Sequence, residues 1–144
     1  MPKVDLQYIQ DSGFRAEQFG TPDAWDQYVK RLTADAEAWV RSRVGASVYA
    51  SPDAFVSRCL VEAERCWCRA ELWRRRAAFL DSNAFTAMGP SAAAERRTYH
   101  DQAAAAQTCA DDWVASALAG QNVGAGNGVS LTTVETGPFR SGVA

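Results

Sequence analysis

Two three-residue segments of the same kind, Thr21-Pro22-Asp23 and Ser51-Pro52-Asp53, divide the first part of the chain. In each, a hydroxyl residue suited to capping a helix precedes a proline for the first helical position and an aspartate for the first turn. These segments predict helices that begin at residues 22 and 52. Gly45 predicts the end of the first helix, and residues 46–50 are expected to form a turn between two antiparallel helices.

The apolar residues after each start recur at steps of three and four, which is typical of amphipathic helices that face a core. The first stripe predicts a helix over 22–44 and consists of Trp25, Tyr28, Val29, Leu32, Ala36, Trp39, Val40 and Val44. The second predicts a central helix over 52–80 and consists of Phe55, Val56, Cys59, Leu60, Ala63, Cys66, Trp67, Ala70, Trp73, Ala77 and Leu80.

A third helix is predicted over 91–119, with Gly120 as its end. Its stripe consists of Tyr99, Ala103, Ala106, Ala110, Trp113, Val114 and Ala117. The many alanines favour a helix and allow close approach to a neighbouring helix. The N-terminal apolar residues, Val4 to Phe19, indicate a short helical turn and a loop over one end of the bundle. The predicted fold class is mainly α, a small bundle of three main helices.

The composition changes after Gly120, where glycines precede a run of β-prone residues. We therefore expect a helical domain over 1–120 and a flexible docking arm over 121–144. The arm would add to a partner as a strand, and the alternative is a disordered tail. Its candidate partner-binding residues are Val129, Leu131, Thr133, Val134, Phe139 and Arg140.

Charge and hydropathy exclude several classes of protein. The formal net charge is -2, and the chain has no long basic run of the kind that dedicated nucleic-acid or anionic-membrane binders carry. Charged residues interrupt every hydrophobic stretch before it reaches the roughly 18 to 20 residues of a membrane-spanning helix. The amino terminus has no apolar signal-peptide core, so the chain is expected to stay in the cytosol.

The residues that usually carry catalysis or bind metals do not form a recognisable set. The four cysteines, Cys59, Cys66, Cys68 and Cys109, match no zinc or redox spacing and are expected to be reduced and to pack as small hydrophobic side chains. His100 is the single histidine and is expected to be solvated. We predict no enzymatic activity, no catalytic residue, no metal and no cofactor.

Arginines form the densest positive feature of the sequence. Arg74, Arg75 and Arg76 are consecutive, and Arg96 and Arg97 lie on the next predicted helix. Guanidinium groups bind phosphates and also form interfacial ion pairs with carboxylates, whereas long arginine stems can simply cover a solvated face. All three interpretations stay open: a solvated face, a protein interface, and a nucleic-acid contact.

Three runs of sequence resemble the small helical head-to-tail connector, or adaptor, proteins of long-tailed bacteriophages and gene-transfer agents. They are DAWDQYVKRLTADAEAWVRSRVG, VSRCLVEAERCWCRAELWRRRAAFL and the ending VSLTTVETGPFRSGVA. The resemblance lies in an early helix that ends in a glycine turn, a long second helix and an extended carboxyl terminus. This chain has more tryptophan and cysteine than that pattern leads one to expect.

The resemblance implies a structural virion protein of the neck region that assembles in the host cytoplasm. Its subunits would form a twelvefold homo-oligomeric ring on the portal protein, contact neck or tail-completion proteins, and let DNA pass without sequence-specific binding. A ring subunit needs a rigid helical wedge and an arm that orders on assembly, and the sequence predicts both. The alternative is a small helical nucleic-acid-binding or regulatory module that uses the arginine cluster.

Overall fold

The structure, a computed structural model, describes residues 1–19, 24–82 and 90–126 and is mainly helical, as predicted. The described elements run in the order α1 (Leu6–Asp11), the 3-10 helix η1 (Ala16–Phe19), α2 (Trp25–Val44), α3 (Ala46–Tyr49), α4 (Ala54–Ser82) and α5 (Pro90–Gly126). The described ranges contain no strand. None of their helices is long and apolar enough to cross a membrane.

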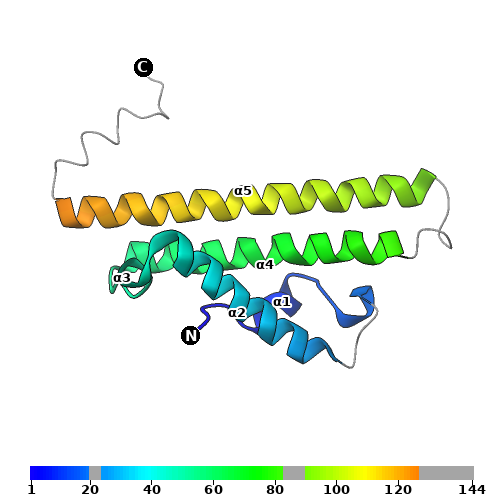
Figure 1. The fold of residues 1–144 in the computed structure, drawn as a ribbon, viewed down its shortest axis with the longest axis horizontal. Coiled ribbons are helices and arrows are strands. Elements are labelled where there is room, and N and C mark those ends of the chain that lie inside the picture. Colours follow the sequence, from blue (N-terminus) through cyan, green and yellow to red (C-terminus); the bar gives the residue numbers. More distant parts are fainter. Residues whose placement is uncertain (20–23, 83–89, 127–144) are drawn as a thin grey trace, which may run out of the picture.

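Helices α4 and α5 form a long antiparallel hairpin, and α2 crosses α4 obliquely on the side away from α5 (Figure 1). The N-terminal segment with α1 lies beside α2, and the short α3 lies where the chain turns from α2 into α4. Helix α4 is therefore the central element, as its predicted length suggested, because it has neighbours on two sides.

Helix α2 confirms the predicted apolar stripe. Trp25, Val29, Leu32, Ala36, Val40 and Val44 are buried, and Tyr28 and Trp39 are half-buried. The helix ends at Val44 because Gly45 takes a φ of 88°, a backbone conformation that favours glycine, and its N–H returns to the Arg41 carbonyl. The helix begins at Trp25, three residues later than predicted, and Thr21 and Pro22 lie outside the described residues.

Helix α4 begins at Ala54, two residues later than predicted, and a different residue caps it. Asp53, rather than Ser51, caps the helix, since its Oδ1 accepts a hydrogen bond of 3.0 Å from the Val56 N–H. Ser51 supports this cap, because its Oγ accepts from the N–H of Asp53 at 3.2 Å. The predicted turn over 46–50 contains the helical turn α3, whose Tyr49 is buried.

Helix α4 buries two faces, whereas the sequence stripe predicted one. The predicted residues Val56, Cys59, Leu60 and Ala63 are fully buried. Cys68, Leu72 and Glu64 also have no exposed surface, although they lie off that stripe. Phe55, which was predicted to face the core, is 54% exposed.

Helix α5 confirms the alanine stripe but not the predicted end. Tyr99, Ala103, Ala106, Ala110, Val114 and Ala117 are buried, and Trp113 is half-buried. The helix passes through Gly120 and continues to Gly126, so the prediction that Gly120 ends it is wrong. A Cβ atom at Gly120 would lie only 2.6 Å from Cδ2 of Phe55, so glycine at this position allows α4 and α5 to approach closely.

The core has two parts, one toward each end of α4. The aromatic-rich part joins the N-terminal segment, α2 and the second half of α4, and includes Phe14, Phe19, Trp25, Leu32 and Leu72. The second part joins the end of α2, α3, the first half of α4 and the second half of α5, and includes Val40, Tyr49, Leu60, Val114 and Ala117.

Candidate functional site

The three consecutive arginines of α4 extend toward different partners. Arg74 pairs with Glu71 and donates from Nη2 to Gln107 on α5 at 2.9 Å. The guanidinium of Arg75 lies 5.1 Å from the ring centroid of Tyr28 on α2. Successive residues of a helix project about 100° apart, which separates the three side chains. The cluster in the sequence is therefore divided in space.

Arg76 also reaches α5, but it contacts a different residue from Arg74. Its Nη2 donates to the Tyr99 hydroxyl at 2.6 Å, and its guanidinium lies 4.4 Å from the centroid of the same ring. The Tyr99 hydroxyl donates in turn to Glu95 at 2.5 Å. Arg96 and Arg97 are exposed on α5. Arg74 and Arg76 thus connect α4 to α5, which is a structural role that none of the three interpretations from the sequence included.

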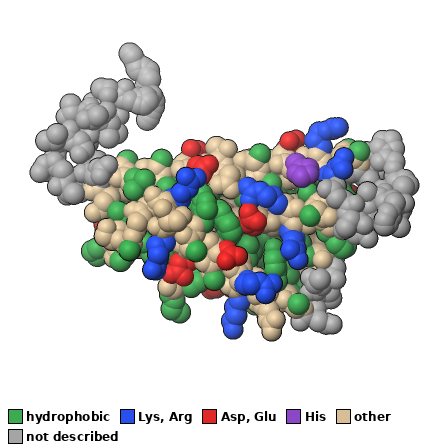
Figure 2. All heavy atoms as spheres, viewed as in Figure 1, with side chains coloured by type: hydrophobic (Ala, Val, Ile, Leu, Met, Phe, Trp, Pro, Cys, Tyr) green, Lys and Arg blue, Asp and Glu red, His purple; other side chains and the backbone are tan. Residues whose placement is uncertain are grey.

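Basic and acidic side chains alternate over the visible face of the molecule, without a large area of one sign (Figure 2). Ion pairs among the described residues include Arg65 with Glu62 at 3.1 Å and Arg43 with Asp111 at 3.2 Å. A surface that attracts nucleic acid through its phosphates concentrates positive charge instead. This face therefore lacks the concentrated positive charge that phosphate binding needs.

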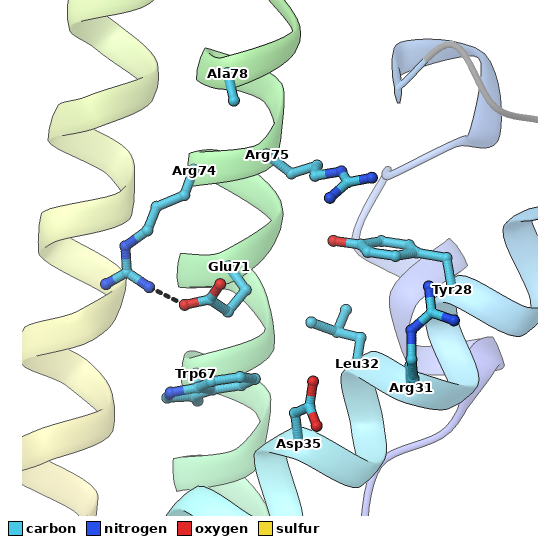
Figure 3. A pocket seen from close by; sticks show the side chains of 9 residues that line it. All are labelled: Tyr28, Arg31, Leu32, Asp35, Trp67, Glu71, Arg74, Arg75 and Ala78. Carbon is cyan, nitrogen blue, oxygen red and sulfur yellow. Dashed lines mark hydrogen bonds and ion pairs between the residues drawn. The ribbon is translucent and has the colours of Figure 1, made fainter.

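Arg74 and Arg75 border a groove of about 400 Å³ between α2 and α4 (Figure 3). Its walls combine aromatic side chains with charges of both signs. It is lined by Tyr28, Arg31, Leu32, Asp35, Trp67, Glu71, Arg74, Arg75 and Ala78. We call these residues the α2–α4 groove.

Some charged side chains of the α2–α4 groove have partners within the chain, and others are exposed to solvent. Glu71 is paired with Arg74 and Arg75 lies over the Tyr28 ring, whereas Arg31 and Asp35 are exposed. Burial raises the pKa of the Tyr28 hydroxyl, although the nearby Arg75 opposes this rise. Tyr28 therefore stays protonated at neutral pH and can donate a hydrogen bond. The groove can hold polar or charged side chains of a partner, with Trp67 as an apolar wall.

A buried carboxylate that the sequence analysis did not single out joins the N-terminal segment to α4. Glu64 accepts a hydrogen bond from the backbone N–H of Lys3 at 2.8 Å and another from the hydroxyl of Tyr49. Burial raises the pKa of Glu64 above its ordinary value, against the effect of these two donors. Burial also raises the pKa of the Tyr49 hydroxyl. These contacts fix the N-terminal segment, and no signal in the sequence spacing linked residues so far apart.

Two of the four cysteines are bonded to each other and two are free. Cys66 and Cys109 form a disulfide between α4 and α5, so the prediction that all four are reduced is wrong for these two. The sequence missed it because the two residues are 43 positions apart and only the hairpin brings them together. Cys59 and Cys68 are free and buried, as predicted. Burial raises the pKa of Cys68 to about 12, so its thiol stays protonated.

The remaining predictions concern metal ligands, the single histidine and the arm residues. Among the described residues, no three of His, Cys, Asp and Glu gather in a way that could hold a metal ion. His100 is exposed on α5. The candidate arm residues Val129, Leu131, Thr133, Val134, Phe139 and Arg140 lie outside the described residues, and the arm stays a prediction.

The chain matches no known protein family, and comparisons with curated proteins and with solved structures find no match either.

Proposed function

We propose that this chain is a structural subunit of a head-to-tail connector, which assembles as a ring on a portal protein and joins the capsid to the neck or tail. The observation that carries this proposal is the α4–α5 hairpin with α2 packed against its other side. A ring subunit needs a rigid body of this kind, because its lateral contacts must keep one geometry around the ring.

Two different surfaces of the molecule suit a head-to-tail lateral contact. The side of α5 away from α4 exposes small residues, including Ala94, Ala104, Ala105 and Ala115. The α2–α4 groove lies beyond α4, on the side where α2 packs (Figure 3). In a ring with cyclic symmetry, each subunit offers one surface to the preceding copy and a different surface to the next.

The arginines favour this role over the alternative of a small nucleic-acid-binding or regulatory module. Arg74 and Arg76 are engaged with α5, and Arg75 lies over the Tyr28 ring. These contacts use part of the donor capacity of Arg74 and Arg76, and they direct the three guanidinium groups to different neighbours instead of to one phosphate-binding surface. A channel through which DNA passes needs neither tight phosphate binding nor base-specific contacts.

The test is assembly of the full chain with the portal protein encoded in the same genome, followed by negative-stain imaging. We expect rings on the portal. Ala105→Arg, on the exposed side of α5, should prevent ring formation, whereas Ser47→Arg, at an exposed position of α3, should not. Circular dichroism should show unchanged helicity in both variants. A chain that stays monomeric with the portal would contradict the proposal.

The arm is tested by deleting residues 127–144, since α5 continues to Gly126. We expect the truncated chain to keep its thermal midpoint and to lose its affinity for the portal. Duplex DNA binding at physiological salt tests the alternative function. Tight, salt-sensitive binding that a folded Arg74→Ala, Arg75→Ala, Arg76→Ala variant loses would favour the nucleic-acid module.

A further inference from the structure

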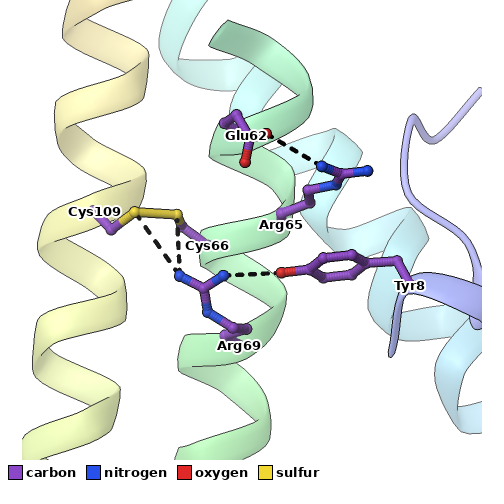
Figure 4. The surroundings of a disulfide bond; sticks show 6 residues. All are labelled: Tyr8, Glu62, Arg65, Cys66, Arg69 and Cys109. Atoms are coloured by element: carbon purple, nitrogen blue, oxygen red, sulfur yellow. Dashed lines mark hydrogen bonds and ion pairs between the residues drawn. A yellow bond between two sulfur atoms is a disulfide. The ribbon is translucent and has the colours of Figure 1, made fainter. Parts of the chain in front are cut away.

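The Cys66–Cys109 disulfide joins the central parts of α4 and α5 (Figure 4). The two Cα atoms are 5.8 Å apart, which is within the usual range for a disulfide. The bridge is thus compatible with the packing of the hairpin, and the alanines around Cys109 allow α5 to lie this close to α4.

The two sulfurs of the bridge differ in their access to solvent. Cys66 is 2% exposed, because α4 is covered on two sides. Cys109 is half-buried, on the outer helix of the hairpin. In thiol–disulfide exchange, a thiolate attacks one sulfur along the S–S axis and the other sulfur leaves. An attacking thiol would therefore reach Cys109, and Cys66 would be the leaving group.

One guanidinium group lies against the bridge. Nη2 of Arg69 is 3.6 Å from Sγ of Cys66 and 4.0 Å from Sγ of Cys109. Nη1 of the same side chain donates to the Tyr8 hydroxyl at 2.9 Å, which fixes its position (Figure 4). A cation at this distance stabilises a thiolate and so makes the sulfur a better leaving group.

Arg65 provides an internal comparison, because it lies one turn away and does not contact the sulfurs. Its Nη1 donates to Glu62 at 3.1 Å, and its guanidinium lies 4.8 Å from the centroid of the Tyr8 ring. The positive charge nearest to the bridge therefore belongs to Arg69.

We propose that the Cys66–Cys109 bridge is a thiol–disulfide exchange site, with Cys109 as the attacked sulfur, Cys66 as the leaving thiolate and Arg69 as the group that stabilises it. The co-reactant is a small monothiol. Its thiolate bonds to Sγ of Cys109 as the S–S bond breaks, and the electron pair of that bond goes to Cys66. A second monothiol then attacks the mixed disulfide, which leaves two reduced cysteines and one oxidised dimer of the monothiol.

The experiment uses the full chain and glutathione. Oxidised glutathione should modify Cys109 in the Cys66→Ser variant at least about tenfold faster than it modifies Cys66 in the Cys109→Ser variant, because access limits the attack. Peptide mass spectrometry after acid quenching identifies the modified residue. Cys59 and Cys68, which are free and buried in the structure, should stay unmodified and serve as internal controls.

The role of Arg69 is tested by the rate at which reduced glutathione opens the bridge. Arg69→Gln should lower this rate by about three- to tenfold, through loss of the cation beside the leaving sulfur. Arg69→Lys should restore most of the rate, and Arg65→Gln should leave it unchanged. Thermal midpoints of the variants are measured alongside. Loosened packing would lower the midpoint and speed the opening of the bridge, which is opposite to the change in rate expected for Arg69→Gln.

Three results would overturn the proposal. The first is a chain with four free thiols after treatment with oxidised glutathione. The second is preferential modification of Cys66. The third is an Arg69→Gln variant whose bridge opens as fast as in the unchanged protein, or faster.

Discussion

The residues that pack against the two sides of α4 differ in size. Toward α5 the buried residues are mostly small, such as Ala103, Ala106, Ala110 and Ala117. Toward α2 and the N-terminal segment they are large and aromatic. The rings of Phe14 and Trp73 lie 5.2 Å apart between centroids. Small residues let two regular helices approach closely, whereas bulky rings fill the less regular space beside short elements.

The two sides also differ in what accompanies the apolar packing. Cations cover the rings toward α2 and the N-terminal segment, as Arg65 covers Tyr8 and Arg75 covers Tyr28. Hydrogen bonds cross on both sides of α4, and Arg76 covers the Tyr99 ring on α5, so what distinguishes the contact with α5 is its covalent bridge. The α5 side should therefore be the more rigid, and the aromatic side the more able to rearrange.

The largest effect is expected from truncating a large buried side chain on α4. Leu60 and Leu72 are both fully buried, Leu60 in the cluster that includes α5 and Leu72 in the aromatic cluster. Each change to alanine should cost about 2–5 kcal/mol of the free energy of unfolding. Leu60→Ala should be the more costly if the α5 side is less able to close a cavity. Urea unfolding measures both, and Val61→Ala at a half-buried position should cost less than either.

Removing the bridge should have the next largest effect. The double variant Cys66→Ala, Cys109→Ala should lose about 2–4 kcal/mol, because the unfolded chain regains the freedom that the cross-link removed. Guanidinium unfolding without reductant measures this loss. A reductant should destabilise the unchanged protein and leave the double variant unaffected. Equal stability of the two proteins without reductant would contradict the prediction.

A smaller loss is expected where α4 and α5 approach at Gly120. Gly120→Ala should cost about 1–3 kcal/mol, because the added methyl group overlaps the Phe55 ring and forces it to move. Phe55→Ala should remove this cost, so the double variant should be no less stable than Phe55→Ala alone. Thermal and urea unfolding of all four proteins complete the cycle. Additive losses would show that the ring and the methyl group do not meet.

The smallest effect at neutral pH is expected from Glu64→Gln, which keeps the size of the side chain. Because burial raises the pKa of Glu64 in the folded state, its contribution to stability is present below the ordinary pKa and is lost as pH rises through the raised one. The unchanged protein should thus lose stability relative to Glu64→Gln as pH rises through this window. Unfolding at several pH values measures the difference in free energy of unfolding between the two proteins. The contributions of the other carboxylates are the same in both proteins and cancel in this difference. A difference that does not vary with pH would contradict the prediction.

The sequence predicted well the elements that have one buried face. Periodicity found the buried residues of α2 and α5, because each packs its apolar stripe on α4. It missed Leu72 and Cys68, since a helix with neighbours on two sides no longer shows a single stripe. A lone glycine inside a helix costs only about 1 kcal/mol, so packing against Phe55 overrides the stop that Gly120 suggested.

The candidate sites were less predictable than the fold. Spacing along the chain identified the arginines but not their partners, which lie on α2 and α5. The Cys66–Cys109 bridge and the contact between Glu64 and Lys3 join residues distant in the sequence, so they depend on the tertiary fold. Tertiary contacts of this kind cannot be read from local pattern.

The central position of α4 has a consequence for the order in which the molecule forms during synthesis. The apolar residues of the N-terminal segment and α2 leave the ribosome first, but their partners on α4 follow later. Leu72 comes 40 positions after Leu32, a delay of roughly two to eight seconds at usual rates of translation. Over that interval the nascent chain exposes Phe14, Phe19 and Trp25, so it is at this stage that a chaperone would be most useful.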